Sequence, residues 1–221
     1  MLLTPRDREV IKFLDVFGQL SSSQIVALEF HDVTRTPFDR CITRLSHSLL
    51  IKRIGRMNIN KAGTAPFVWQ LGLAGHRYLN KHGRWRQHVV APHELSVADC
   101  FVNLVQAQRD GRLVLDKFVK EQTVGKARAD AFVAMSSPDG VKQVQLYIEV
   151  DQGWQRPNVI QGKLRAYLDA WSNSSGTMPR VMFLCQDMMR VRELRFEVNQ
   201  LKAEDRELFT ADLLSSFPQR T

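Results

Sequence analysis

The chain has 221 residues, of which 44% are hydrophobic and 24% are charged, and it carries a formal net charge of +8. This composition is ordinary for a soluble globular protein, and the length allows one large domain or two small ones. No apolar run approaches the roughly 18 residues of a membrane span, and the first residues lack the apolar stretch of a signal peptide. We therefore expect a cytoplasmic protein with no membrane partner, whose widely spaced Cys41, Cys100 and Cys185 stay reduced.

The excess positive charge lies in the first part of the chain. Residues 1–90 contain 14 Lys and Arg against 6 Asp and Glu, a net charge of +8, whereas residues 91–221 contain 17 of each. A basic module followed by a neutral one is typical of a protein in which one part contacts a polyanion. A basic surface that serves only solubility is the alternative. We predict two domains, at residues 1–86 and 91–221.

Three short helices are predicted at the start of the chain. The first begins at Thr4 and Pro5, a hydroxyl N-cap followed by proline, and ends at Gly18. The second opens with the serines at 21–23, and the third begins at about residues 34–36. Opposite its apolar stripe, the third helix carries Arg35, Arg40, Thr43, Arg44 and His47. Three short helices, the last with a basic face, are typical of a helix-turn-helix.

Two strands with a polar loop between them follow the third helix. Residues 50–54 and 67–71 have the pattern of strands, and residues 55–66 are polar and rich in turn formers. Strands joined by a basic loop after a recognition helix predict a winged helix, which a short helix at residues 72–81 closes. The wing contributes three cationic residues, namely Arg53, Arg56 and Lys61.

The predicted winged helix indicates double-stranded DNA as a partner. Arg35, Arg40 and Arg44 have the guanidinium groups that form paired hydrogen bonds with guanine edges in the major groove. The wing residues are expected to contact phosphates, which set register and affinity without reading the base sequence. A winged helix that makes protein contacts, with its arginines solvated, is the alternative.

The second part of the chain has a mixed pattern, so the fold class is α/β overall (α+β). The pattern predicts a helix at 94–108, strands at 112–119, 129–135 and 143–150, a helix at 158–171 and a strand at 181–185. Two more polar helices are predicted between Met188 and Leu214. Those last helices are amphipathic enough to form a homodimer contact, or equally to cap the sheet.

Three carboxylates interrupt apolar strands of this second part. Asp130 lies at the start of its strand, while Glu149 and Asp151 close the next strand two residues apart, so that both project to one face. Carboxylates gathered at strand ends can hold Mg²⁺, which prefers oxygen ligands, and such an ion can activate water against a phosphodiester. Acids that merely keep strand ends soluble are the alternative.

The order αβββαβ with these acids resembles the PD-(D/E)xK nuclease core. More closely, the helix-turn-helix pattern together with RADAFV (128–133), YIEVDQG (147–153) and KLRAYLDAW (163–171) resembles the replication-relaxation family of plasmid and mobile-element proteins. The resemblance implies metal ligands at Asp130 and Glu149, with Asp151 as a third. It also implies that Glu94 on the first helix of this domain is an accessory acid.

Two departures from the nuclease motif matter. Ala129 stands where the motif has a proline, and Asp151 stands where it has the lysine that steadies the attacking water. Some nuclease cores take that lysine from the following helix, where Lys163 is the candidate and Tyr167 lies one turn later on the same face. A nuclease scaffold that has lost catalysis competes with an active site, because fold does not imply function.

We therefore expect a DNA-binding protein of a plasmid or other mobile element, with a nuclease-like domain that serves replication or transcription regulation. The enzymatic alternative is a Mg²⁺-dependent endonuclease or nickase that uses Asp130, Glu149, Asp151 and Lys163. A weaker alternative is a protein-only adaptor in a replication or defence complex. The sequence has no phosphate-binding glycine loop, so we expect no nucleotide cofactor.

Overall fold

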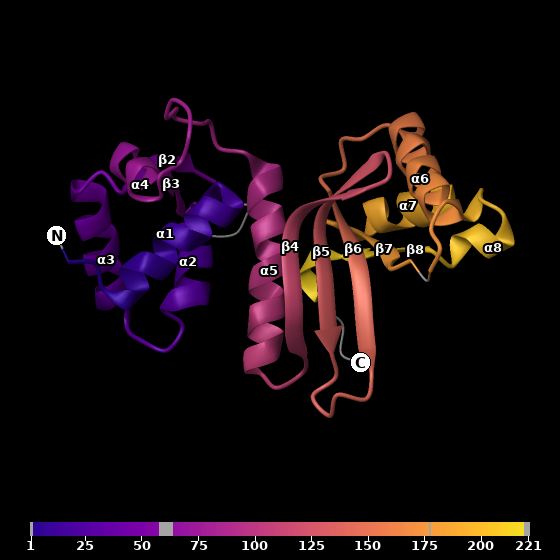
Figure 1. The fold of residues 1–221 in the computed structure, drawn as a ribbon, viewed down its shortest axis with the longest axis horizontal. Helices are drawn as coiled ribbons and strands as arrows, with labels where there is room; N and C mark the ends of the chain where they lie inside the picture. The colour runs from indigo at the N-terminus through magenta and orange to yellow at the C-terminus, as the bar shows by residue number, and fades with distance from the viewer. Residues whose placement is uncertain (1, 58–63, 177, 219–221) are drawn as a thin grey trace. The chain divides into compact units, whose positions relative to one another are not determined.

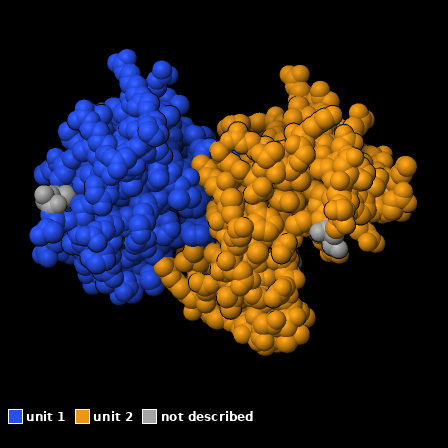
Figure 2. Space-filling model, viewed as in Figure 1, with its two compact units in different colours: residues 1–102 blue, residues 103–221 orange. Residues whose placement is uncertain are grey.

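The structure is a computed structural model that describes residues 2–57, 64–176 and 178–218. Within this part of the chain there are eight α-helices, one 3-10 helix and two β-sheets, the mixed α and β class that the sequence predicts (Figure 1). The chain divides into two compact units, Met1–Val102 and Asn103–Thr221 (Figure 2). The division falls inside helix α5, Pro92–Arg109, and the domain limits at residues 86 and 91 stay a prediction. None of the described helices is long and apolar enough to cross a membrane.

The first unit combines short helices with a three-stranded antiparallel sheet in the order β1-β3-β2. Its elements are α1 Pro5–Phe17, β1 Gln19–Ser21, α2 Ser22–Glu29, α3 Arg35–His47, β2 Ile51–Arg56, β3 Phe67–Leu71 and α4 Leu73–Tyr78. Strand β1 was not predicted, because three residues are too few to show a period of two. It forms because its backbone pairs with β3, from Gln19 opposite Gln70 to Ser21 opposite Val68.

Local side chains fix the ends of the first two helices. The Thr4 hydroxyl accepts from the backbone N–H of Asp7, whose carboxylate accepts from the backbone N–H of Thr4. Ser21 and Gln24 form the same reciprocal capping box at the start of α2. Helix α1 ends at Gly18, whose φ of 73° is a conformation that costs glycine little. These caps are local in sequence, which explains why the helix starts could be predicted.

The first half of α5 belongs to the core of the first unit. The Phe101 ring lies 5.2 Å from the Phe17 ring, measured between centroids, and Phe17 is 1% exposed. The Gln24 amide nitrogen donates to Leu95 O and to Asp99 Oδ1, both at 2.7 Å. Burial raises the pKa of Asp99 to about 6, and the hydrogen bond from Gln24 offsets only part of this increase.

We expect Asp99→Asn to stabilise the protein at pH 7.5 by about 1–3 kcal/mol. The pKa of Asp99 is higher in the folded state, at about 6, than in the unfolded chain, where it is near 3.8. Protonated Asp99 therefore favours folding fully below about pH 3.8, and this contribution to stability is lost as the pH rises through about 6. Asparagine keeps the oxygen that accepts from Gln24 and carries no charge to desolvate. Urea unfolding at pH 4 and 7.5 measures the difference, with the exposed Asp110→Asn as control. An Asp99→Asn advantage that is equal at both pH values would contradict this account.

The second unit is built on a five-stranded sheet in the order β4-β5-β6-β7-β8. Its elements after α5 are β4 Val114–Val124, β5 Ala127–Ser136, β6 Gln143–Asp151, α6 Pro157–Ser172, β7 Arg180–Cys185, α7 Met188–Asn199, α8 Ala203–Arg206, β8 Phe209–Leu213 and the 3-10 helix η1 Leu214–Ser216. Strands β4, β5 and β6 pair antiparallel, whereas β6, β7 and β8 pair parallel. Buried residues of α6 and α7 pack with β7 and β8 in one hydrophobic core, which Tyr167 and Phe183 help to fill.

The prediction of helices throughout 188–214 is wrong at its end, where residues 209–213 form strand β8. Phe209 and Ala211 are buried, while Thr210 between them is partly exposed, which is the alternation of a strand. The segment pairs with β7 from Phe209 opposite Val181 to Leu213 opposite Cys185. Five residues between polar stretches carry too weak a period to be recognised, and the neighbouring strand decides the conformation.

Candidate functional site

An exposed polar stripe runs along helix α3. Thr36, Arg40, Thr43 and His47 recur at steps of three and four residues and are all exposed. The opposite side of the helix is buried through Phe38, Cys41, Ile42 and Leu45. The stripe borders a shallow hollow lined by Thr36, Asp39, Arg40, Thr43 and Arg44. Of the predicted α3 residues, Arg40, Thr43 and His47 thus lie together on a surface that a ligand can reach.

Arg44 is used differently from Arg40, although it lies one turn away. Its guanidinium donates to both carboxylate oxygens of Asp7 on α1, at 2.6 and 3.2 Å, and Asp7 is 0% exposed. Hydrogen bonds from Arg44, Cys41 and Thr4 outweigh burial and hold the pKa of Asp7 below its usual range. Arg44 thus holds α3 against α1 through Asp7, and its predicted base contact stays a prediction.

Arg35 also has partners within the first unit. Its guanidinium forms an ion pair with Asp39 one turn later, at 3.0 Å, and lies 4.4 Å from the centroid of the Phe38 ring. The side chains of Arg35 and Asp39 remain more than half exposed, so the pair is weak. Arg35 is thus positioned at the start of α3 without being buried.

The strand that follows α3 adds further positive charge. Arg53 and Arg56 on β2 both lie over the Phe67 ring of β3, with guanidinium carbons 4.6 and 3.8 Å from its centroid. Both side chains are exposed, and each guanidinium group stacks on the Phe67 ring at the surface. The predicted wing residue Lys61 lies outside the described residues.

In the second unit, strand β6 and helix α6 meet at a buried carboxylate. Glu149 is 1% exposed, and the Lys163 ammonium donates to its Oε2 at 2.5 Å. The Tyr167 hydroxyl donates to the other carboxylate oxygen at 2.7 Å. Burial raises the pKa of Glu149 despite the Lys163 charge, and the nearby Asp130 acts in the same direction. The structure thus brings together Glu149, Lys163 and Tyr167, which the sequence placed at one site.

Asp130 on β5 and Asp151, two residues after Glu149 on β6, have partners of their own. Asp130 Oδ2 accepts from the backbone N–H of Val150 at 2.7 Å, where β5 and β6 diverge. Asp151 is 2% exposed, and Arg190 on α7 donates to both its carboxylate oxygens, at 2.7 and 3.0 Å. Asp151 is therefore held by an ion pair with a different helix from the one that pairs with Glu149.

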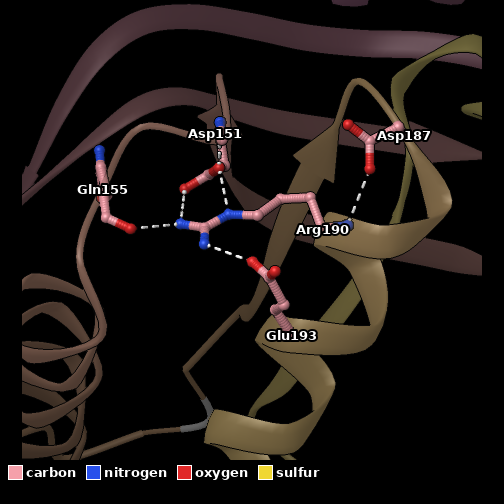
Figure 3. A network of polar contacts seen from close by, with 6 residues as sticks. Asp151, Gln155, Asp187, Arg190 and Glu193 are labelled. Atoms are coloured by element: carbon pink, nitrogen blue, oxygen red, sulfur yellow. Dashed lines mark hydrogen bonds and ion pairs between the residues drawn. The ribbon is translucent and has the colours of Figure 1, made fainter.

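Sequence reasoning missed Arg190, which is the centre of a polar network (Figure 3). Besides Asp151, its guanidinium donates to Glu193 Oε2 and to the backbone oxygen of Gln155, both at 2.9 Å. The Asp187 carboxylate caps α7 by accepting from the Arg190 backbone N–H. The network ties the loop after β6 to the start of α7. No local sequence pattern predicts this network, because Asp151 and Arg190 are 39 residues apart in the chain.

Two of the three predicted metal ligands, Glu149 and Asp151, are engaged in ion pairs that do not favour a divalent cation, and the metal site stays a prediction. Both oxygens of Glu149 and both of Asp151 already accept from protein groups, and each carboxylate has a cationic side chain as its partner. In residues 2–57, 64–176 and 178–218, no group of three or more His, Cys, Asp or Glu is arranged to hold a metal. Lys163 and Arg190 supply the positive charge that Mg²⁺ would otherwise bring.

The remaining predicted acid, Glu94, lies in the first turn of α5. It belongs to the first unit, whereas Asp130, Glu149, Asp151 and Lys163 belong to the second. Its accessory role stays a prediction.

Comparison with known proteins gives one match. The model of the replication-relaxation family matches residues 11–181, which is more than three quarters of the chain and includes α3, Asp130, Glu149 and Lys163. No curated protein and no solved structure gives a significant match.

Proposed function

The chain belongs to the replication-relaxation family, and on this premise we propose that it is a DNA-binding regulator of replication on a plasmid or other mobile element. The first unit recognises duplex DNA, and the second unit is a nuclease-like scaffold that does not cut DNA and serves regulation. The observation that carries the proposal is the exposed polar stripe of α3 together with the exposed arginines of β2 that stack on Phe67.

The geometry of the first unit supports duplex recognition in two ways. Three helices followed by an antiparallel pair of strands is the order of a winged helix, whose third helix enters the major groove. Arg40 can pair with the O6 and N7 acceptors of guanine, and Thr43 can contact a neighbouring base edge. Arg53 and Arg56, fixed over Phe67, are suited to phosphates beside that groove.

The second unit supports a role without catalysis. A hydrolytic site needs carboxylates free to bind a metal, whereas Glu149 and Asp151 are buried in ion pairs with Lys163 and Arg190. The same ion pairs hold α6 and α7 against the end of β6, so both acids have a structural role. Under this proposal the domain contributes partner or dimer contacts.

Two measurements on the full chain test the proposal. We expect Arg40→Ala to weaken binding to a duplex that contains the recognised site by about tenfold, while the exposed Arg192→Ala on α7 changes nothing. We also expect no nicking of supercoiled plasmid with Mg²⁺ or Mn²⁺, by the wild type or by Glu149→Ala.

Each half of the proposal has its own contrary result. Equal duplex affinity of Arg40→Ala and the wild type would remove α3 from the DNA interface. Nicking by the wild type that Glu149→Ala abolishes, with DNA binding retained, would make the second unit a metal-dependent nuclease.

A further inference from the structure

One face of the second unit's sheet carries an aromatic pair that no part of the proposed function uses. Phe132 on β5 and Tyr147 on β6 are direct cross-strand partners, with ring centroids 5.6 Å apart, and both side chains are partly exposed. Their neighbours on the opposite face are buried: Ala131, Val133, Leu146 and Ile148. The lower halves of β4, β5 and β6 extend past α6 and α7 (Figure 1). The Tyr147 ring also packs on the buried Tyr167 of α6, with centroids 6.3 Å apart, so Tyr147 joins the partly exposed Phe132 to the edge of the helix-covered core.

Positive charge accompanies the rings. The Lys117 ammonium of β4 lies 5.9 Å from the centroid of the Phe132 ring, and its side chain is exposed. Lys117 and Phe132 come from paired strands, since Lys117 lies opposite Ala134 and Val119 opposite Phe132. A nucleic-acid base can stack on an exposed aromatic ring, and a lysine near the ring can pair with the adjoining phosphate.

Tyr147 also forms a wall of a hollow of about 770 Å³. The other walls are the turn between β4 and β5, the end of α6 and residues 173–176 and 178–179, and they include Lys126, Asp169 and Asn173. The size matches a small-molecule site, and the lining combines apolar surface with a few polar groups. Lys126 can contact a phosphate, and the Asp169 carboxylate can accept from a base amino group. Tyr147 thus belongs both to the aromatic pair and to the lining of the hollow.

We propose that this surface, defined by Lys117, Lys126, Phe132 and Tyr147, binds single-stranded DNA. Unpaired bases stack on the Phe132 and Tyr147 rings, and the two lysines contact the adjoining phosphates. A duplex cannot bind in the same way, because its base faces are already stacked on one another. The site lies on residues other than those proposed for duplex recognition, so either binding activity can fail without the other.

The test measures binding of the full chain to a fluorescein-labelled oligo-dT of about 15 nucleotides by fluorescence anisotropy. We expect Phe132→Leu and Lys117→Glu each to lower the oligo-dT affinity by about tenfold and to leave duplex affinity unchanged. Leucine keeps the apolar volume and removes the ring, and circular dichroism checks that both variants fold. The matched control for charge is Lys202→Glu, at an exposed position before α8.

Arg40→Ala supplies the reciprocal control, because it is expected to weaken duplex binding and to spare oligo-dT binding. Oligo-dT binding that both sheet variants retain would overturn the assignment of the site. Absence of oligo-dT binding by the wild type would overturn the proposal itself. A loss of duplex and oligo-dT affinity in equal measure would also overturn it, since a shared electrostatic effect would then explain both.

Discussion

Replacing Arg190 with methionine is expected to lower the free energy of unfolding by about 3–5 kcal/mol. The substitution leaves Asp151, 2% exposed, without the guanidinium that donates to both its oxygens. Asp151 keeps the backbone N–H of Gly153 as a donor, but a buried carboxylate without its cation is far costlier than the ion pair. The loop after β6 also loses its tie to α7, because Arg190 donates to the Gln155 backbone oxygen. Urea unfolding followed by circular dichroism measures the change.

Two variants separate the buried pair from a general effect of removing an arginine. Arg192→Met, on the exposed side of the same helix, is expected to change stability by no more than about 0.5 kcal/mol. The double variant Asp151→Leu with Arg190→Met is expected to recover much of the loss, because no buried charge then remains. Equal stability of Arg190→Met and Arg192→Met would show that the network contributes nothing.

Replacing Lys163 with methionine is expected to cost about 2–3 kcal/mol at pH 7.5, less than at Arg190 because the Lys163 side chain is 30% exposed. Glu149 keeps the Tyr167 hydroxyl as a donor and loses its cation, so its pKa rises further above the usual range. Because the pKa of Glu149 is higher in the folded state than in the unfolded chain, protonated Glu149 favours folding at low pH, and this contribution is lost as the pH increases. The deficit of Lys163→Met should therefore shrink at pH 5.

The same unfolding measurement at pH 5 and 7.5 checks this expectation. Lys202→Met, at an exposed lysine, is the control for loss of a surface charge. The double variant Glu149→Gln with Lys163→Met should lose the pH dependence, because the titrating group is gone. A deficit of Lys163→Met that is the same at both pH values would mean that Glu149 does not depend on Lys163 for its charge.

Local signals account for what the sequence could predict of the fold. Capping residues such as Thr4 and Ser21 satisfy helix ends with side chains three residues away, so they can be read without knowing the tertiary structure. The meeting of Glu149 with Lys163 and Tyr167 also follows from short-range geometry. A helix that returns directly from the end of β6 places its early turns beside that strand end.

Long-range pairs account for what could not be predicted. Periodicity placed Arg40 and Arg44 on one face of α3, but only the packing of α1 shows that Asp7 takes Arg44. The pair of Asp151 with Arg190 depends likewise on where α7 begins against the sheet. In both cases a buried acid selects one arginine of several. Helical spacing carries no information about that choice.

The assignment of Arg44 changes the expected DNA interface. With Arg44 engaged by Asp7 and Arg35 paired with Asp39, the proposed base contacts fall first on the exposed stripe of Thr36, Arg40, Thr43 and His47. Arg40 is then the only arginine of that stripe. Under the proposed function, Arg40→Ala is therefore the decisive test of base recognition, while variants of Arg53 and Arg56 test the proposed phosphate contacts.

The salt dependence of duplex binding tests the central claim most directly. If the exposed cations of the first unit contact phosphates, counterions are released, and wild-type affinity should fall about a hundredfold between roughly 50 and 200 mM salt. Arg56→Ala should lower the slope of log affinity against log salt by about one. An affinity that hardly changes over this range, with the same slope for Arg56→Ala, would contradict DNA binding by this surface and favour a protein partner.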